Sequence, residues 1–272
     1  MKLQDKKILL TGATGATGGI GKEVALALAN QGAKLVLVAR RLAQLEDMRA
    51  SLPNSECHHV LALDLTQPHD LESLSEHCRA CIDDQCIDIV INNAGYNQFD
   101  LLSRRSAQSV SQEVQLNLTV PILLTQSALQ WINRPGLILN VGSTLAGIGY
   151  PGYSAYCAAK SGLYRFSEAL NRELDGSGIK VLYLAPRTTD TSLNSEYVRL
   201  MNQQLGNHCD DASLVAQHFV QVLQKEVEVR WIGWPEKLFV RINQLLPNVV
   251  SNTIRKQQET IHHFIRSMHK NV

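Results

Sequence analysis

The stretch Thr11-Gly12-Ala13-Thr14-Gly15-Ala16-Thr17-Gly18-Gly19-Ile20-Gly21 follows directly on the apolar run Ile8-Leu9-Leu10. The apolar run predicts a buried strand, and the amphipathic pattern over residues 20–31 predicts a helix. Glycines between a strand and a helix allow a tight turn and a close approach of the backbone to a pyrophosphate. The amino end of the following helix then presents its N–H groups to the phosphates. This stretch therefore predicts a dinucleotide site at the start of an α/β fold.

Two glycine patterns overlap in this loop. Residues 14–21 fit T-G-x-x-x-G-I-G, and residues 11–18 fit T-G-x-x-G-x-x-G. The triplet Thr-Gly-Ala occurs twice in a row, so the loop is three residues longer than either pattern needs, and the glycine of either copy can form the turn after the strand. Both patterns stay open, and the candidate phosphate-binding residues are Gly12, Gly15, Gly19, Ile20 and Gly21.

Short apolar runs and longer amphipathic stretches alternate outward from this loop. The runs predict strands over residues 6–11, 34–39, 58–63, 87–92, 136–141, 179–184 and 228–233. The stretches between them predict helices over residues 20–31, 41–51, 67–83, 104–130 and 153–175. This alternation is typical of a doubly wound, mostly parallel sheet with helices on both faces, the Rossmann fold. We expect one dinucleotide-binding and catalytic domain over residues 1–233.

The composition excludes several other classes of protein. The chain has 272 residues with 26 basic and 25 acidic side chains, and a net charge of +1 argues against nucleic-acid binding. No apolar run reaches the roughly 18 residues of a spanning helix, and no secretory signal pattern is present, so we expect a cytoplasmic protein. His77 with Cys78, Cys81 and Cys86 lacks the paired ligand clusters of a structural zinc site. No metal site is predicted, and we expect free thiols.

Residues 234–272 are expected to form an amphipathic helical extension, not an independent domain. Residues 230–272 carry seven Lys and Arg and two Glu, a local charge of +5 that leaves −4 for the rest of the chain. Apolar residues recur at helical spacing on both sides of Pro247, which predicts two helices with basic outer faces. These helices can pack on the domain or on a second subunit, or they can make a peripheral contact with an anionic membrane.

The end of the second predicted strand indicates which dinucleotide binds. An acidic residue there would bind the ribose 2′-hydroxyl, but the strand ends in Ala39 and is followed by Arg40 and Arg41. A guanidinium group binds phosphate through its planar fork, so we expect NADP(H). Asp64 and Leu65 follow the third strand, where Asp64 can cap the next helix or contact the adenine.

Four further features make the chain resemble the short-chain dehydrogenase/reductase family, in its single-domain branch. They are Asn92-Asn93-Ala94-Gly95 after the fourth strand, Asn117, Ser143, and Tyr156-Cys157-Ala158-Ala159-Lys160, in that order. The resemblance covers residues 6–190 and implies a seven-stranded sheet in the order 3-2-1-4-5-6-7. It also implies a homo-oligomer, a dimer or a tetramer, that pairs the long helices near residues 104–130 and 153–175.

The same features predict the catalytic group. Tyr156 and Lys160 stand four residues apart on one helix and are neighbours on its face. A phenol has a pKa near 10, and a nearby ammonium favours the phenolate, so Tyr156 is predicted to be general acid in reduction and general base in oxidation. The resemblance implies that Ser143 binds the substrate oxygen. It also implies that Asn117 kinks its helix and holds a water that relays protons to Lys160.

One position departs from the family pattern. The family usually has Pro-Gly after the sixth strand, whereas this chain has Pro186-Arg187. The resemblance implies nicotinamide contacts from Thr188 and Thr191, and Arg187 can contact substrate or phosphate, or face solvent. The resemblance adds to the nucleotide site Asn93, Ala94, Gly95, Tyr156, Lys160, Pro186, Thr188 and Thr191.

The substrate pocket implied by the resemblance is mostly apolar. Its expected lining residues are Tyr96, Phe99, Leu145, Ile148, Tyr150, Tyr153 and Leu193. An apolar lining favours a lipophilic ketone or a 3-oxoacyl compound, interconverted with its secondary alcohol. Two alternatives stay open: a catalytically idle NADP(H)-binding regulator, and a sugar-nucleotide epimerase. The short segment after the sixth strand argues against the epimerase, because such relatives usually carry a larger substrate domain.

Overall fold

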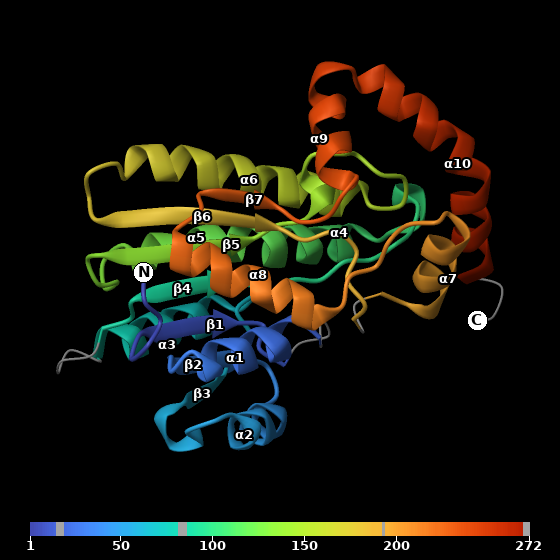
Figure 1. Cartoon of the computed structure of the whole chain (residues 1–272). Coiled ribbons are helices and arrows are strands. Elements are labelled where there is room, and N and C mark those ends of the chain that lie inside the picture. The colour runs from blue at the N-terminus through green and yellow to red at the C-terminus, as the bar shows by residue number, and fades with distance from the viewer. Residues whose placement is uncertain (15–18, 81–85, 192–193, 269–272) are drawn as a thin grey trace.

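The computed structural model describes residues 1–14, 19–80, 86–191 and 194–268 (Figure 1). Several residues that the sequence analysis singled out lie outside these ranges. They are Gly15 and Gly18 of the glycine-rich loop, Cys81, Leu193 and Lys270. What the sequence predicts for these residues stays a prediction.

Seven parallel strands form one sheet in the order β3-β2-β1-β4-β5-β6-β7, which confirms the predicted topology. The strands are β1 (Lys7–Thr11), β2 (Lys34–Ala39), β3 (His59–Ala62), β4 (Ile89–Asn92), β5 (Gly136–Val141), β6 (Ile179–Ala185) and β7 (Val229–Trp231). At the centre, Leu9 of β1 pairs with Val36 of β2 and Val90 of β4, and all three are buried. Such continuous apolar strands are expected where helices cover both faces of a sheet.

Helices form a layer on each face of the sheet (Figure 1). One layer packs side chains of α1, α2 and α8 against the sheet, and the other packs those of α3, α5 and α6. The helices are α1 (Ile20–Asn30), α2 (Leu42–Ser51), α3 (Pro68–Ala80), α4 (Ala107–Val114), α5 (Val120–Ala128), α6 (Ser154–Glu173), α7 (Glu196–Gln204), α8 (Ala212–Lys225), α9 (Glu236–Leu245) and α10 (Pro247–Met268).

The predicted helix over residues 104–130 is not continuous, and it is interrupted around Asn117, where the family resemblance implied a kink. The segment consists of α4 and α5 joined by a π-helical turn, Gln115–Thr119, after a short 3₁₀ turn at Leu102–Arg104. The side-chain amide of Asn117 donates to the carbonyl of Glu113, 2.8 Å away. That carbonyl is the one to which the backbone N–H of Asn117 would bond in an α-helix, so the side chain competes with the regular ladder.

Two helices, α7 and α8, are absent from the helices expected from sequence. The missed stripe in α8 is clear, because Val215, Phe219 and Val222 are fully buried at helical spacing. Its first residue follows Asp211, whose side chain accepts from the Ser213 N–H at 2.7 Å as an N-cap. The helix packs beside α1 and completes one face of the core.

The expected pair of amphipathic helices at the C-terminus corresponds to α9 and α10, which meet at Pro247 and project beyond the sheet (Figure 1). Val240, Ile261 and Ile265 are buried against the body of the molecule, whereas Leu245 is 80% exposed. The apolar stripe is therefore divided between a packed part and an uncovered part. Among the described helices, none combines the length and the hydrophobicity that crossing a membrane requires.

Candidate active site

The carboxyl ends of β1 and β4 lie side by side where the strand order reverses, which is the usual place for a ligand in such sheets. Thr11 joins the two ends, because its hydroxyl oxygen accepts from the N–H groups of Asn93 and Ala94, each at 3.0 Å. The Asn93 amide donates in return to the carbonyls of Thr11 (3.0 Å) and Gly12 (3.2 Å). These bonds fix the turn that begins the glycine-rich loop.

The described glycines of this loop leave space that no other residue would leave. Gly12 has a φ of +68°, and a Cβ there would lie 2.7 Å from the Cα of Ala94. A Cβ on Gly21 would clash with the carbonyl oxygen of Gly12. No side chain caps the first turn of α1 in the described residues, so its N–H groups are available to a phosphate. The arrangement fits a pyrophosphate, with Gly12 directly after the strand.

The residues expected around the adenine end of the nucleotide follow β2 and β3. Arg40 and Arg41 are exposed and form no ion pair within the described part of the chain. The Asp64 carboxylate accepts from the N–H (3.1 Å) and the hydroxyl (2.8 Å) of Thr66, so it stabilises the turn before α3, and Leu65 beside it is buried. The two arginines remain accessible to a phosphate group.

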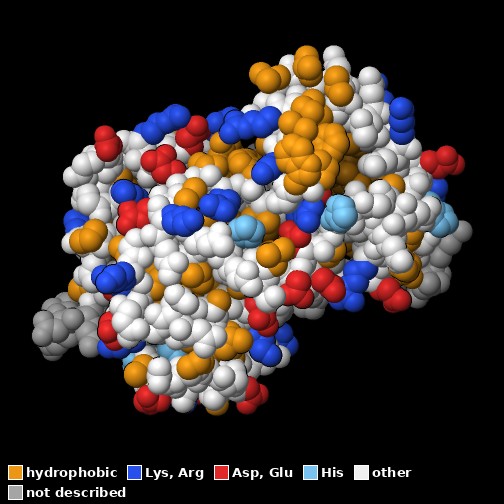
Figure 2. Space-filling view, in the orientation of Figure 1, with side chains coloured by type: hydrophobic (Ala, Val, Ile, Leu, Met, Phe, Trp, Pro, Cys, Tyr) orange, Lys and Arg blue, Asp and Glu red, His pale blue; other side chains and the backbone are white. Residues whose placement is uncertain are grey.

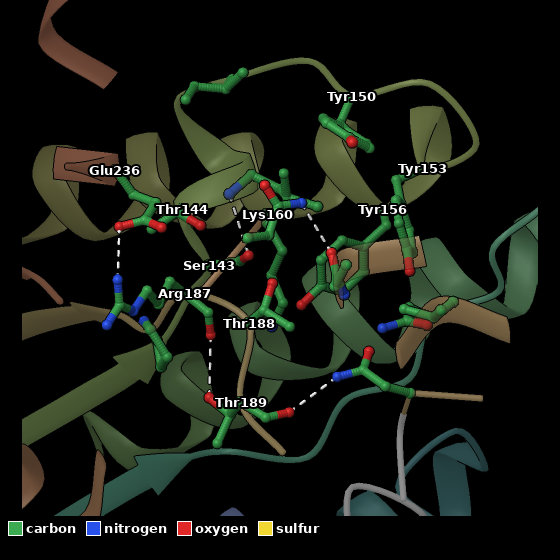
Figure 3. A pocket seen from close by; sticks show the side chains of 18 of the residues that line it. Ser143, Thr144, Tyr150, Tyr153, Tyr156, Lys160, Arg187, Thr188, Thr189 and Glu236 are labelled. Carbon is green, nitrogen blue, oxygen red and sulfur yellow. Dashed lines mark hydrogen bonds and ion pairs between the residues drawn. The ribbon is translucent and has the colours of Figure 1, made fainter. Parts of the chain in front are cut away.

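All four predicted catalytic residues line one cavity of about 310 Å³. Figure 3 shows Ser143, Tyr156 and Lys160 between the side chains of Tyr150 and Tyr153 and the ion pair of Arg187 with Glu236. The predicted nucleotide residues that line the same cavity are Ile20, Asn93, Gly95, Tyr156, Lys160, Pro186, Thr188 and Thr191. Gly19 joins this group indirectly, because a Cβ on it would lie 2.8 Å from Thr191 Cγ2.

Tyr156 is 9% exposed at the floor of this cavity. Burial raises the pKa of its phenol, and a hydrogen bond with Ser143 opposes that change. From the sequence, Lys160 was expected to lower this pKa, but within the chain alone burial has the largest effect and the pKa is raised. The phenol is therefore protonated at neutral pH, which is the form that a general acid requires.

Lys160 lies one turn along α6 from Tyr156 and is 4% exposed. Its Nζ donates to the Val141 carbonyl at 2.8 Å and lies 5.8 Å from the centroid of the Tyr156 ring. Burial lowers the pKa of Lys160 to about 8. The group is then an ammonium at neutral pH, close enough to stabilise negative charge that develops on the phenol oxygen.

Asn117 turns an unpaired acceptor toward Lys160. Its amide nitrogen donates to the carbonyls of Tyr96 (2.6 Å) and Glu113 (2.8 Å), while its Oδ1 is buried with no partner among the described residues. A Cβ on Gly95 would lie 2.9 Å from this Oδ1 and 3.7 Å from Lys160 Nζ. The absence of a side chain at Gly95 thus leaves a small polar space between the two groups. Such a space suits a water molecule or a hydroxyl group that hydrogen-bonds to both.

Arg187 has a role that neither interpretation of the sequence included. Its guanidinium makes a two-pronged bond to Asp210, at 3.0 and 2.7 Å, and pairs with Glu236 at 3.0 Å. It also donates to the carbonyl of Trp234 at 3.2 Å. The side chain therefore connects the loop after β6 to the first turn of α9. Its charge is neutralised by two carboxylates of the protein itself, those of Asp210 and Glu236. Arg187 packs against Gly233, whose φ is +97°.

Most of the expected substrate-pocket residues line the cavity, and one does not. Tyr96, Leu145, Ile148, Tyr150 and Tyr153 line it. Phe99 instead packs beneath Tyr153, with ring centroids 5.0 Å apart, and contributes to a core cluster shared with α10. The prediction for Phe99 was wrong because its neighbour on the far side, α10, is remote in sequence.

The outer wall of the cavity comes from elements that the sequence analysis did not place there. These residues are Val198, Met201, Asn202, Asn207, His208, Phe239, Val250, Thr253, Ile254 and Gln257, from α7, the loop after it, α9 and α10. For those on α9 and α10, the sequence signal was the amphipathic pattern of the extension, which does not say what the apolar face covers; those on α7 and in the loop after it were not predicted.

No group of three or more His, Cys, Asp or Glu residues in the described ranges is placed to hold a metal ion. Cys57, Cys86, Cys157 and Cys209 are free thiols.

The sequence matches the family model described as short chain dehydrogenase over residues 7–201. The chain belongs to the short-chain dehydrogenase family. It is 35% identical over 175 residues to a 3-oxoacyl-(acyl-carrier-protein) reductase of Haemophilus influenzae, covering 64% of this chain and 71% of the relative. This short-chain dehydrogenase is therefore an oxidoreductase that acts on carbonyl and alcohol groups.

Solved structures share the fold. A short-chain dehydrogenase of Sphingobium yanoikuyae in complex with NADPH superposes with a TM-score of 0.72 at 26% identity, covering 90% of this chain and 95% of the other. A bulky-bulky ketone specific alcohol dehydrogenase of Comamonas testosteroni gives a TM-score of 0.71 at 26% identity, covering 90% and 94%. The covered share of this chain is larger than residues 7–201, so the similarity in structure extends beyond the family-model match.

Proposed function

We propose that this short-chain dehydrogenase is an NADP(H)-dependent reductase that converts a lipophilic ketone or 3-oxoacyl compound to its secondary alcohol. The observation that carries the proposal is the protonated, buried Tyr156 on the floor of a cavity that also presents Ser143 and Lys160. A dehydrogenase that reduces carbonyls needs this combination of a proton donor, a hydrogen-bond donor for the oxygen and a cation.

The preference for NADP(H) is supported by charge. Arg40 and Arg41 follow β2 without a carboxylate partner in the described residues, and the strand ends in Ala39 where an acidic residue would repel a 2′-phosphate. The Sphingobium relative in complex with NADPH supports the same cofactor class. We assign the pyrophosphate to Gly12, Gly19 and the amino end of α1, together with the loop glycines outside the described residues.

When bound, the nicotinamide supplies the hydride for the carbonyl carbon. Tyr156 donates its proton to the carbonyl oxygen, and Ser143 holds that oxygen by a hydrogen bond. The Lys160 ammonium stabilises the phenolate that forms. A water in the space beside Gly95, held by Asn117 Oδ1 and Lys160, returns a proton toward Tyr156.

The substrate class rests on the walls of the cavity. Leu145, Ile148 and Val198 contribute apolar side chains on its inner and outer sides, and Phe239 and Ile254 extend them onto the extension. Apolar walls favour a lipophilic chain beside the reacting carbonyl. The named activities of the Haemophilus and Comamonas relatives are of the same kind, one on 3-oxoacyl groups and one on bulky ketones.

We propose that residues 1–233 form the nucleotide-binding and catalytic domain and that residues 234–272 are an extension that folds only against it. The burial of Val240, Val250 and Ile261 on that domain supports this division.

We further propose that two or four copies associate through α5 and α6, where Leu123 is 42% exposed. Light scattering of the purified protein measures the number of copies.

Fluorescence titration with NADPH and NADH tests the cofactor. We expect Arg40→Ala/Arg41→Ala to weaken NADPH binding by roughly 10- to 100-fold, the loss of one or two charge-assisted bonds, with NADH affinity unchanged. Arg49→Ala is the matched control, because Arg49 lies on α2, the helix that follows the two arginines, but pairs with Glu46 at 2.8 Å. If wild type bound neither nucleotide, the proposal would be overturned.

A screen of ketones and 3-oxoacyl thioesters, in which the absorbance of NADPH reports its consumption, tests the reaction. We expect turnover to increase with the length of the apolar chain on the substrate. Tight NADPH binding without turnover of any carbonyl compound would favour the idle regulator instead.

A further inference from the structure

The corner where α9 meets α10 carries an unusual concentration of exposed apolar side chains. Of the twelve large hydrophobic residues exposed in the described part of the chain, six lie within residues 234–249. The other six are scattered singly over the rest of the chain. We call the six the corner patch: Trp234, Leu238, Phe239, Leu245, Leu246 and Val249.

The corner patch lies at the most projecting part of the molecule. Figure 2 shows hydrophobic side chains gathered over α9 and the start of α10, with Lys and Arg side chains beside them. Leu245 is 80% exposed, Leu246 60% and Val249 53%. Leaving such side chains in water is unfavourable, and a grouped set of them marks an interaction surface.

The charges around the patch identify its partner. Lys237, Arg241, Arg255 and Lys256 all lie on the two helices and are exposed, and Lys237 stacks over the Trp234 ring at 5.4 Å. Of the two acidic residues on these helices, Glu236 is already paired with Arg187, and Glu259 is exposed further along α10, so the four basic residues outnumber them. The surface is therefore apolar at its tip and positive at its border.

We propose that the corner patch docks on an anionic lipid bilayer. Leucines at a helix corner enter the acyl boundary, a tryptophan lies at the interface, and the basic border meets the lipid phosphates. A second copy of the same face is a poorer partner, because two positive borders would repel each other in a symmetric contact.

The location of the cavity agrees with this partner. Phe239 belongs to the corner patch and also lines the cavity. Val250 and Ile254, which lie outside the patch on α10, line the cavity too. An apolar substrate that enters between α9 and α10 would pass directly from the bilayer to Tyr156. This second step rests on the proposed function, whereas the docking itself does not.

Vesicle sedimentation of the full chain tests the docking. We expect binding to vesicles of phosphatidylcholine mixed with phosphatidylglycerol, weaker binding to phosphatidylcholine alone, and a loss of binding in high salt. The variant Leu245→Glu/Leu246→Glu should bind roughly tenfold less or worse, and Lys237→Gln/Arg241→Gln should lose the preference for the anionic vesicles. Leu102→Glu/Leu214→Glu is the matched control, with two exposed leucines changed elsewhere, and should bind as wild type.

Tryptophan fluorescence gives an independent readout. Trp234 is 62% exposed and Trp131 is buried, so contact with anionic vesicles should shift the emission to shorter wavelength, and Trp234→Phe should remove the shift.

Three outcomes would overturn the proposal: no sedimentation with either vesicle, equal loss in the control variant, or a change in the number of copies in Leu245→Glu/Leu246→Glu with vesicle binding retained. The last would make the patch a subunit interface. NADPH titration of the same variants separates this result from the proposed function, since nucleotide binding should be unaffected.

Discussion

Tyr156 is the residue on which the proposed reaction depends. Replacing its hydroxyl by hydrogen in Tyr156→Phe keeps the ring packed against Tyr153 but removes the proton donor. We expect kcat for ketone reduction to fall roughly 10²- to 10⁴-fold, with NADPH affinity retained. The absorbance of NADPH measures the rate of ketone reduction, and fluorescence titration measures the affinity for NADPH. Tyr164→Phe is the control, because Tyr164 lies on the same helix but does not line the cavity; a Tyr156→Phe variant near the wild-type rate would exclude Tyr156 as the donor.

Lys160 makes the free energy of unfolding depend on pH. Its pKa is about 8 when folded and 10.5 ordinarily, so between these values the unfolded chain binds more protons and stability rises with pH. Below pH 8 both states carry the charge, and the fold bears the full cost of burying it. As the pH rises from about 8 to 10.5, we expect the free energy of unfolding of wild type to increase by up to about 3 kcal/mol relative to that of Lys160→Met. Urea unfolding of both proteins at several pH values measures the difference, and parallel curves would contradict it.

At the residue scale, the sequence was sufficient to predict a functional residue where both its chemical type and the order of the motifs along the chain are constrained. Asn117, Ser143, Tyr156 and Lys160 were expected together and lie around one cavity. Arg187 was not interpretable, because its partners Asp210 and Glu236 are 23 and 49 residues away and no local pattern links them.

Among the elements, α9 is held to the body by the Arg187 ion pairs. Arg187→Met would leave the carboxylate of Asp210, with a side chain 4% exposed, without its cation. We expect the free energy of unfolding to fall by about 3 kcal/mol, because an unpaired buried charge is costly. Chemical unfolding measures the loss. Asp210→Asn in the same chain should restore part of it; if the double variant were no more stable than Arg187→Met, the pairing would not be the cause.

The elements themselves were predicted unevenly, for physical reasons. The strands from β1 to β6 were found within two residues of their ends, since each is a short apolar run between polar turns. Periodicity did not reveal the break between α4 and α5, because the break depends on hydrogen bonds of Asn117 to Tyr96 and Glu113. Only the family resemblance, which implied a kink at Asn117, pointed to it.

At the scale of the whole molecule, α10 is part of the core. Ile261 and Ile265 are fully buried with Phe99 and Tyr153. We expect Ile265→Ala to lower the free energy of unfolding by about 2–4 kcal/mol, from lost burial and the cavity left behind. The matched control is Val249→Ala on the same helix, 53% exposed, which should change it by less than about 0.5 kcal/mol. Equal losses, compared by thermal and urea unfolding, would mean that α10 does not pack as described.

Only the inner wall of the cavity could be predicted from the sequence. Its inner wall follows from motifs between Asn93 and Thr191, whose positions are fixed by the ends of parallel strands. Its outer wall depends on how α7, α9 and α10 fold back, which is a long-range packing question that the sequence leaves open.

This division has an evolutionary consequence. The inner wall lies within residues 7–201, where the family match holds, and much of the outer wall lies after it. The residues proposed for the chemistry are thus encoded apart from Phe239, Val250, Thr253, Ile254 and Gln257, which form part of the substrate-facing wall. Exchange of the last 39 residues, 234–272, between related chains is a route by which a new substrate could be acquired while the inherited reaction is kept intact.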